Sequence, residues 1–549
     1  MKKIIVLNIL ILFSAATFSQ TPHFQWAKGS TGNNNDNAYG VATDPSGNVF
    51  IAGYFISSTI TFGSFSLTNA GSQDIYLVKY DASGNVLWAK SAGGNGFDDA
   101  FSVATDLSGN VFITGMFSSP SINFDTVSLT NLSGADMYLA KYDANGNALW
   151  AVNTGGSGYQ SGQSVATDIA GDIYVAGIFV SPTISFGSTT FNNAGLHDMF
   201  LAKYKSNGAL VWARSAGGTD QDLAASVTTD VSGNVYVTGN FESPTLSFGS
   251  VTITKRDTCE MFIVKYNTNG TALWARNAGT TNADDINCVV TDPRGNVYVT
   301  GNFSSHTMTF GGTSINNSGS DDWYILKFNT GGNLLWAKSE GGTNNDDAFS
   351  IATDADGNVY VAGDFFSSSI TIGTTTMINA GSNSYDACIA KYDSLGNVKW
   401  ATSAGGVLGD IAASITTDAF SNTYVLGTFG SSSITFGPTT LTNTSANDIY
   451  LVKIDTASIN VGTLEINKDD NGILIYPNPF SSKTTILFSE EQKNTEIKIT
   501  DVIGKVIKTF IMKDEKNITL EKGELKEGIY FVQITNEMKS VVNKKIIVQ

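Results

Sequence analysis

The chain has 549 residues, of which 15% are charged and 11% aromatic, with 56 Gly against 9 Pro. This length exceeds one ordinary hydrophobic core, so we expect several domains or a repeat array, built from short strands and tight turns. The formal net charge is −17; residues 461–549 carry 13 basic and 13 acidic groups, so the first 460 residues hold the whole excess. Such an acidic body repels nucleic acid and anionic lipid surfaces, which argues against both as partners.

Residues 1–20 are typical of a secretory signal peptide. Lys2 and Lys3 precede an apolar run at 4–13, and small residues follow it before an expected cleavage near Gln20. The apolar run is too short to span a bilayer, and no later stretch is long and apolar enough for a transmembrane segment. No Cys follows the run, so we expect no lipid at the mature N-terminus.

Two residue types recur with one period across most of the chain. Successive Trp residues are separated by five intervals of 62 residues and one of 64: Trp26, Trp88, Trp150, Trp212, Trp274, Trp336 and Trp400. A marker Asp keeps the same period: Asp44, Asp106, Asp168, Asp230, Asp292, Asp354 and Asp418. Self-similarity at a fixed period indicates one supersecondary unit copied in tandem, here seven times.

Each unit reads as four antiparallel strands. In residues 100–152, two apolar, β-branched runs flank the turn 106–110, and two further runs flank 144–147. The D-x-x-G-N connection suits a type I turn followed by a left-handed Gly. The segment 121–131 predicts an extra short hairpin between the second and third strands, which explains the long period.

The ends of the array predict how it is completed. A fourth-strand sequence at 24–28 precedes the first marker Asp, and the array stops after a third strand at 449–455. We therefore expect the N-terminal strand to complete the last sheet and close a seven-bladed β-propeller over residues 22–456, rather than an open solenoid.

The consensus SVATDxxGNVYVTGxF…SITFGxxxLTNxGxxDIYLAKYDxxGNVLWAK over residues 24–455 resembles the SBBP-type β-propeller repeat of bacterial secreted proteins. The third repeat departs from it with Asp172 for the turn Asn, and the seventh with Ser421 for the turn Gly. The sixth repeat carries two extra residues at 382–385. The resemblance implies an all-β propeller outside the cytoplasm, and it names no substrate.

After a linker at 457–471, residues 472–549 alternate apolar and polar residues in short runs, which predicts a small Ig-like β-sandwich. Three motifs are distinctive: Tyr476, Pro477, Asn478, Pro479 and Phe480; Gly528, Ile529 and Tyr530; Lys544 and Lys545. Together they resemble the type A C-terminal sorting domain of the type IX secretion system of Bacteroidetes. The resemblance implies that the secretion machinery is a partner, with passage through the periplasm to the outer-membrane surface or the medium.

The face opposite the D-x-x-G-N turns collects the inserts and the connections between units, so we expect ligands there. An acidic position lies eight residues before the marker Asp, with Gln160 in the third repeat: Asp36, Asp98, Asp222, Asp284, Asp346 and Asp410. These residues either form a ligand or cation ring at the channel mouth or accept local backbone N–H groups and shape their loops.

The sequence offers few residues for a metal, cofactor or nucleophilic site. Cys259, Cys288 and Cys388 look like substitutions at repeat positions, and the three His residues are scattered, so we expect no metal or cofactor; calcium is a weak alternative. The leading hypothesis is a monomeric, non-enzymatic surface module that binds an extracellular glycan or protein or acts as a scaffold. The alternative is a carbohydrate-active enzyme, a glycosidase or lyase, that uses channel carboxylates.

Overall fold

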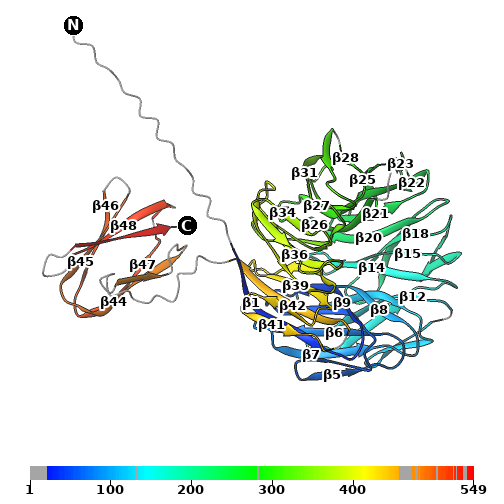
Figure 1. The fold of residues 1–549 in the computed structure, drawn as a ribbon, viewed down its shortest axis with the longest axis horizontal. Helices are drawn as coiled ribbons and strands as arrows, with labels where there is room; N and C mark the ends of the chain where they lie inside the picture. Colours follow the sequence, from blue (N-terminus) through cyan, green and yellow to red (C-terminus); the bar gives the residue numbers. More distant parts are fainter. Residues whose placement is uncertain are drawn as a thin grey trace, which may run out of the picture. The chain divides into compact units, whose positions relative to one another are not determined.

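The computed structural model describes residues 21–456 and 473–548, with gaps at 132, 257, 281–283, 311, 445, 477–479, 481, 502–504, 524, 527 and 536–540. It divides into two compact units, Met1–Ala457 and Ser458–Gln549, and every regular element of the described residues is a β-strand (Figure 1). The predicted signal peptide, and all of the linker, lie outside the described residues.

The first unit contains seven antiparallel sheets, numbered here sheet 1 to sheet 7 along the chain: six have four strands, and the fourth strand of sheet 7 continues into pairing with a short hairpin. The first strands are β2 (Asp36–Thr43), β8 (Asp98–Thr105), β14 (Gln160–Thr167), β20 (Asp222–Thr229), β26 (Asp284–Thr291), β32 (Asp346–Thr353) and β38 (Asp410–Thr417). The second strands are β3 (Val49–Phe55), β9 (Val111–Phe117), β15 (Ile173–Phe179), β21 (Val235–Phe241), β27 (Val297–Phe303), β33 (Val359–Phe365) and β39 (Thr423–Phe429).

The third strands are β6 (Asp74–Tyr80), β12 (Asp136–Tyr142), β18 (Asp198–Tyr204), β24 (Cys259–Tyr266), β30 (Asp322–Phe328), β36 (Asp386–Tyr392) and β42 (Asp448–Thr456). The fourth strands of sheets 1 to 6 are β7 (Val86–Ala92), β13 (Ala148–Asn153), β19 (Leu210–Ala216), β25 (Ala272–Thr280), β31 (Leu334–Glu340) and β37 (Val398–Ala404). Second and third strands are buried along nearly their whole length, because neighbouring sheets cover both of their faces.

The predicted extra hairpin is present in every sheet. The pairs are β4 (Thr59–Phe62) with β5 (Phe65–Thr68), β10 (Ser121–Phe124) with β11 (Val127–Thr130), β16 (Thr183–Phe186) with β17 (Thr189–Asn192), β22 (Thr245–Phe248) with β23 (Val251–Thr254), β28 (Thr307–Phe310) with β29 (Thr313–Asn316), β34 (Ser369–Ile372) with β35 (Thr375–Ile378), and β40 (Ser433–Phe436) with β41 (Thr439–Thr442). At least two apolar residues of each hairpin are buried, as Ile60 and Phe62 are in the first.

The D-x-x-G-N turns have the geometry that their sequence predicts. Asp44 Oδ1 accepts the N–H groups of Ser46 and Asn48 at 2.9 and 3.0 Å, and Gly47 takes a φ of +79°. In the seventh turn, Ser421 adopts the same left-handed conformation at a φ of +62°, which costs more for a residue with a Cβ.

The repeated Trp residues join each sheet to the next. The Trp88 indole Nε1 donates to the Ala144 carbonyl, 3.2 Å away in the turn before the fourth strand of sheet 2, and Trp26, Trp150, Trp212, Trp274 and Trp336 make the matching bond. Trp400 is the exception: its buried Nε1 has no hydrogen-bond partner among the described residues. The acceptor turn has no counterpart in sheet 7, whose third and fourth strands belong to opposite ends of the array.

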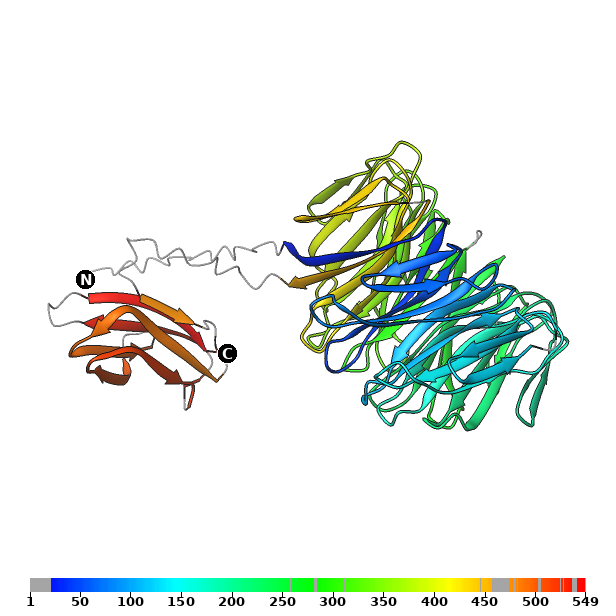
Figure 2. The same ribbon diagram turned by 90° about the horizontal axis from the view of Figure 1, so that it is seen from below.

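The N-terminal strand β1 (Pro22–Thr31) is the fourth strand of sheet 7. It pairs with β42 from Pro22 opposite Thr456 to Gly29 opposite Tyr450, which is the pairing that the strand count predicts. Figures 1 and 2 both show β1 beside β42 although the two strands are more than four hundred residues apart in the chain. The unit is thus an all-β array of β-propeller-like repeats, with its first strand contributed to its last sheet.

The second unit packs two sheets over one apolar core. One sheet contains β43 (Ile473–Tyr476), β44 (Lys483–Gln492) and β47 (Glu515–Glu521); the other contains β46 (Val506–Met512), β45 (Thr495–Thr500), β48 (Gly528–Thr535) and β49 (Val541–Val548). Ile486, Ile497, Val532 and Ile546 are fully buried between them. The alternation of Ile497 and Ile499 with polar neighbours places one face of β45 in this core.

Candidate ligand-binding cavity

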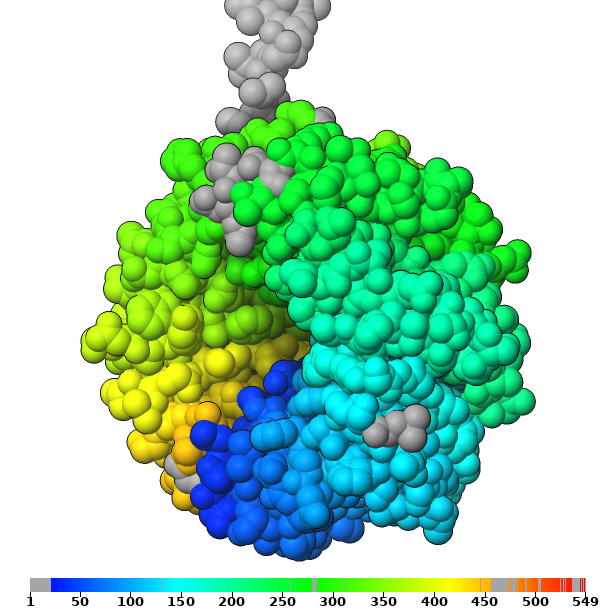
Figure 3. Space-filling view, turned by 90° about the vertical axis from the view of Figure 1, so that its right-hand side faces the viewer, coloured from blue at the N-terminus to red at the C-terminus, as the bar shows by residue number. Residues whose placement is uncertain are grey.

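The first strands of the seven sheets surround a cavity of about 220 Å³ at the centre of the first unit. The space-filling view shows the chain colours following one another around a central hollow (Figure 3). Small and hydroxyl side chains such as Ser102 and Ser164 line it together with aliphatic residues such as Val103 and Val227. A cavity of this size takes a small ligand or the end of a larger one.

Every first strand carries a β-bulge at the same position. In sheet 1 the pairing with β3 shifts between Ala38 and Gly40, so Tyr39 is the extra residue, and the other six sheets shift at the matching point. A bulge leaves one residue unpaired and re-aims its side chain. All seven bulge residues line the central cavity: Tyr39, Phe101, Gln163, Ala225, Asn287, Phe349 and Ala413.

The seven repeats differ in chemistry at the bulge position. It supplies three aromatic rings, two amides and two Ala residues, whereas the next position is a small polar residue or Gly in all sheets. The rings of Tyr39 and Phe101 meet edge to face with centroids 5.3 Å apart. Burial raises the pKa of the Tyr39 hydroxyl, so it stays a neutral phenol that can donate and accept hydrogen bonds.

The two amides are held by their neighbours. Gln163 Nε2 donates to Ser161 Oγ at 2.9 Å, and Asn287 Nδ2 donates to the Ala348 carbonyl at 2.9 Å. Aromatic faces beside fixed amides form an uncharged, amphipathic lining, which suits a neutral ligand with both C–H faces and hydroxyl groups. The sequence analysis did not predict these residues. The repeats do show a position of variable residue type two residues before a constant Val or Ile, and that position is the bulge.

The predicted acidic ring lies at the starts of the first strands and is buried there: Asp36 is 1% exposed, and the other members and Gln160 are 0% exposed. In five sheets the carboxylate accepts a serine hydroxyl of its own sheet, as Asp98 Oδ2 does from Ser119 Oγ at 2.6 Å. Backbone N–H groups, such as that of Gly94, complete the shell. This is the geometry of the loop-shaping interpretation; a ligand ring at these residues stays a prediction.

In four sheets the marker Asp forms an ion pair with a Lys of the third strand. Lys79 Nζ lies 3.6 Å from Asp44 Oδ2 and donates to the Ala144 carbonyl of the next sheet at 3.0 Å. In sheet 3, Asp172 draws both Lys203 and Lys205 to about 3 Å, which accounts for the acidic residue in place of the turn Asn. These buried charges are structural, and none of them lines the cavity.

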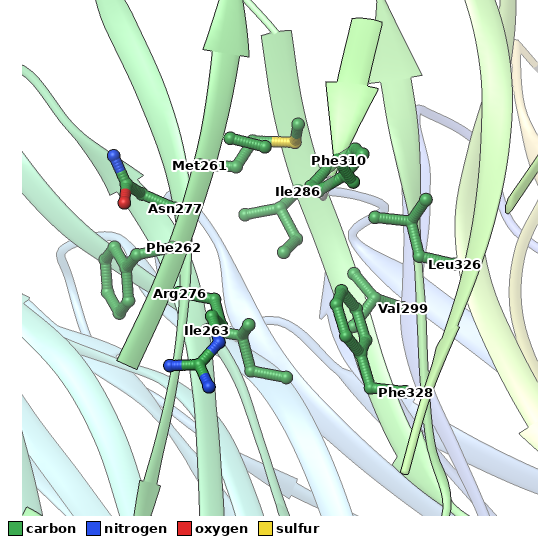
Figure 4. Close-up of a pocket in the computed structure, with 11 residues that line it drawn as sticks. Met261, Phe262, Ile263, Arg276, Asn277, Ile286, Val299, Phe310, Leu326 and Phe328 are labelled. Atoms are coloured by element: carbon green, nitrogen blue, oxygen red, sulfur yellow. The ribbon is translucent and has the colours of Figure 1, made fainter. Parts of the chain in front are cut away.

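A second cavity lies between sheets 4 and 5, lined by apolar side chains that include Met261, Ile263, Ile286 and Val299 (Figure 4). Its volume is about 10 Å³, which is room for one water molecule at most. It is a packing gap. The three cysteines are free thiols, and no group of three His, Cys, Asp or Glu side chains in the described part of the chain could hold a metal ion.

The sorting motifs fall partly within the described residues. Phe480 is 2% exposed in the core of the second unit, and the Tyr530 hydroxyl donates to the Lys526 carbonyl at 2.9 Å. Pro477, Asn478 and Pro479 lie outside the described residues, as do the side chains of Tyr476, Ile529 and Lys545. Gly528 and Lys544 lie on β48 and β49, which pair along their full length.

Residues 474–549 match the family described as the secretion system C-terminal sorting domain. The type IX sorting domain predicted from the three motifs is therefore confirmed, and the protein is secreted to the cell surface or extracellular space. None of the described residues forms a helix with the length and apolar character needed to cross a membrane.

Two curated proteins are similar to part of this chain. An uncharacterized WD repeat-containing protein of Acanthamoeba polyphaga mimivirus is 25% identical over 492 residues, covering 72% of this chain and 35% of the relative. Regulatory protein FlaEY of Caulobacter vibrioides is 24% identical over 350 residues, covering 58% of this chain and 36% of the relative. The chain thus spans about a third of the length of the curated relatives that it matches.

Solved structures resemble the chain only loosely. Sqt1 from Chaetomium thermophilum covers 80% of this chain and 100% of its own at 9% identity, with a TM-score of 0.35. A member of the duf4221 family from Bacteroides vulgatus covers 63% of this chain and 93% of its own at 9% identity, with a TM-score of 0.30. Scores this low carry no argument about function.

Proposed function

We propose that this secreted protein is a binding module that holds part of a neutral extracellular glycan in its central cavity. The observation that carries the proposal is the set of bulge residues: their side chains line the central cavity in all seven sheets, and their chemistry changes from sheet to sheet. Rings such as Phe101 and Phe349 offer faces for the C–H side of a sugar, and the amides of Gln163 and Asn287 offer oxygens that can accept its hydroxyl groups.

We propose further that the seven sheets form a closed propeller, which makes the cavity a single site. Three contacts between sheets 7 and 1 repeat those between other neighbours. Thr43 Oγ1 donates to the Thr417 carbonyl at 2.9 Å, as Thr105 does to Thr43 and so on through all seven first strands. The Val41 N–H donates to Ser414 Oγ, and the Asp36 N–H to the Asn447 carbonyl.

The test is a screen of the full secreted chain against an array of neutral and charged glycans, followed by calorimetry of the best ligand. Phe101→Ala and Phe349→Ala should each weaken binding by about tenfold, the effect of losing one well-packed aromatic contact. Ala already occupies this position in sheets 4 and 7, so the fold should tolerate both changes. Leu149→Ala, an exposed outer-strand residue, is the control and should bind as the wild type does.

If the ligand binds both Phe→Ala variants with the affinity of the wild type, the cavity is not its binding site. The carbohydrate-active enzyme alternative needs a pair of carboxylates at the cavity, and the side chains that line it are aromatic, amide, hydroxyl, thiol or aliphatic. Turnover of a polysaccharide by the purified chain, abolished by one Asp→Asn change, would support that alternative over simple binding.

A further inference from the structure

Four carboxylates gather between sheets 5 and 6, at the ends of the strands away from the D-x-x-G-N turns. Asp347 and Asp364 lie directly opposite each other on β32 and β33. Asp347 also interacts electrostatically with Asp321 and Asp285 of sheet 5, and those two interact with each other. Like charges opposite each other in a sheet are destabilising, so this acidic cluster needs an explanation.

The scaffold does not require acid at these positions. Where sheet 6 has Asp347, sheet 4 has Leu223 and sheet 7 has Ile411; where it has Asp364, sheet 2 has Met116 and sheet 3 has Ile178. Apolar residues therefore serve the fold at both positions. The cluster is specific to sheets 5 and 6.

Asp364 is the member least suited to a purely structural role. It is 4% exposed, and its Oδ1 has no hydrogen-bond partner among the described residues. Burial and the nearby carboxylates Asp347 and Asp346 raise its pKa well above the usual range. A buried carboxyl group without a hydrogen-bond partner is costly whether it is neutral or ionised, and a bound cationic donor would offset that cost.

Aromatic rings border the cluster. Tyr385 interacts with Asp321, Asp347 and Asp364, and its ring lies 4.9 Å from that of Phe366. Tyr385 follows the two residues by which the sixth repeat exceeds the others. Ring faces beside spread carboxylates suit a planar organic cation, which can stack on the rings and donate to the carboxylates. The described carboxylates form no group of three that could hold a metal ion.

We propose that the acidic cluster binds an arginine side chain presented by a protein partner. The guanidinium group is planar, can donate to several carboxylate oxygens at once and stacks on aromatic faces, whereas an ammonium group is a compact point charge. The site consists of other residues than those of the central cavity, so this inference goes beyond the proposed glycan binding and does not depend on it.

The experiment measures binding of an N-acetylated, C-amidated Gly-Arg-Gly peptide to the full secreted chain at pH 7.5 by calorimetry. The matching Gly-Lys-Gly peptide should bind about tenfold more weakly. Asp364→Asn should weaken binding of the arginine peptide by about tenfold. The fold should tolerate Asn here, because Asn240 and Asn302 occupy this position in sheets 4 and 5. Asp347→Asn is a second variant with the same expectation.

Asp99→Asn is the matched control. Asp99 stands in sheet 2 where Asp347 stands in sheet 6, but its carboxylate already accepts Gln73 Nε2 at 2.8 Å. Peptide affinity should be unchanged in this variant. For the wild type it should fall from pH 7.5 to pH 5, because burial and the surrounding Asp285, Asp321 and Asp346 raise the pKa of Asp347 to about 6.

Absence of arginine-peptide binding, or full binding by folded Asp364→Asn and Asp347→Asn, overturns the proposal. Tighter binding of a glucosamine oligosaccharide or of calcium chloride than of the peptide also overturns it, because the occupant would then be an amino sugar or a metal. Glycan binding measured on the same variants keeps the two proposals apart: loss of peptide affinity alone leaves the central cavity unaffected.

Discussion

Within one first strand, nearby residues make different kinds of contact. In β2, the Asp36 carboxylate holds its own loop, the Thr43 hydroxyl bonds the neighbouring sheet, and Tyr39 between them faces the cavity. The first two are repeated because each unit needs them to fold and to dock. The bulge residue is under no such demand, so its identity can vary from sheet to sheet.

The seventh turn offers a direct test of backbone strain. Ser421→Gly should stabilise the first unit by about 0.5–1 kcal/mol, because Ser421 holds a left-handed φ that only Gly adopts freely. Gly357→Ser makes the opposite change in the sixth turn and should destabilise by a similar amount. Urea unfolding followed by tryptophan fluorescence measures both; equal stability in the two variants would contradict this account of the turn.

The Trp residues separate hydrogen bonding from packing. Trp88→Phe and Trp400→Phe remove the same indole N–H, but only Trp88 Nε1 has an acceptor. Losing that bond should make Trp88→Phe more destabilising than Trp400→Phe by about 1 kcal/mol. Thermal unfolding of both variants checks the difference. A Trp400→Phe chain that melts as low as the Trp88→Phe chain would show that Trp400 has an acceptor elsewhere.

At the scale of the element, β1 differs from every other strand because its partner lies at the far end of the array. Its pairing with β42 makes two chain ends into one sheet, and Ser30 and Thr31 extend the same strand onto β4 of sheet 1. A strand that bridges two sheets stabilises both, and its loss exposes an unpaired edge.

Deletion of residues 21–31 should therefore lower the melting temperature of the first unit and make the chain self-associate through the open edge of β42. Light scattering after size-exclusion chromatography, together with calorimetry, measures both effects. Removal of β49 at the other end of the chain is the control, because the second unit has its own core and the melting of the first should not change. A trimmed chain that stays monomeric and equally heat-resistant would refute the closed propeller.

At the scale of the whole molecule, buried carboxyls that recur at one repeat position in five sheets contribute to the response to pH. Burial raises the pKa to about 6 at the first residue of the third strand in five sheets: Asp74, Asp136, Asp198, Asp322 and Asp386. The unfolded chain has ordinary carboxyl pKa values near 3.8, so between about pH 4 and 6 the folded state binds more protons than the unfolded state.

The stability of the first unit should consequently increase as the pH falls from 7.5 to 5, because the raised pKa values favour the protonated folded state. Scanning calorimetry at constant ionic strength measures the trend. Asp74→Asn combined with Asp136→Asn should flatten it, since each change removes one titrating group. A melting temperature that falls steadily over this pH range would show that other groups dominate.

The sequence alone determined the repeat, its four strands, its turns and the pairing of the first strand with the last sheet, because all of these follow from local periodicity and turn chemistry. The sorting domain was legible for the same reason, as its motifs are contiguous. The candidate ligand-binding residues could not be predicted from the sequence. A bulge breaks the two-residue alternation, so only the folded register shows that Tyr39 and its counterparts face the axis.

Likewise, the acidic cluster joins residues from four segments of two sheets, and no spacing in the chain brings Asp285 and Asp364 together. Only tertiary packing could decide that the predicted Asp ring is buried against its own loops while less regular residues line the central cavity. The physical reason is that local hydrogen bonding is encoded in neighbouring residues, whereas the lining of a cavity depends on which side chains the packing of several sheets brings together.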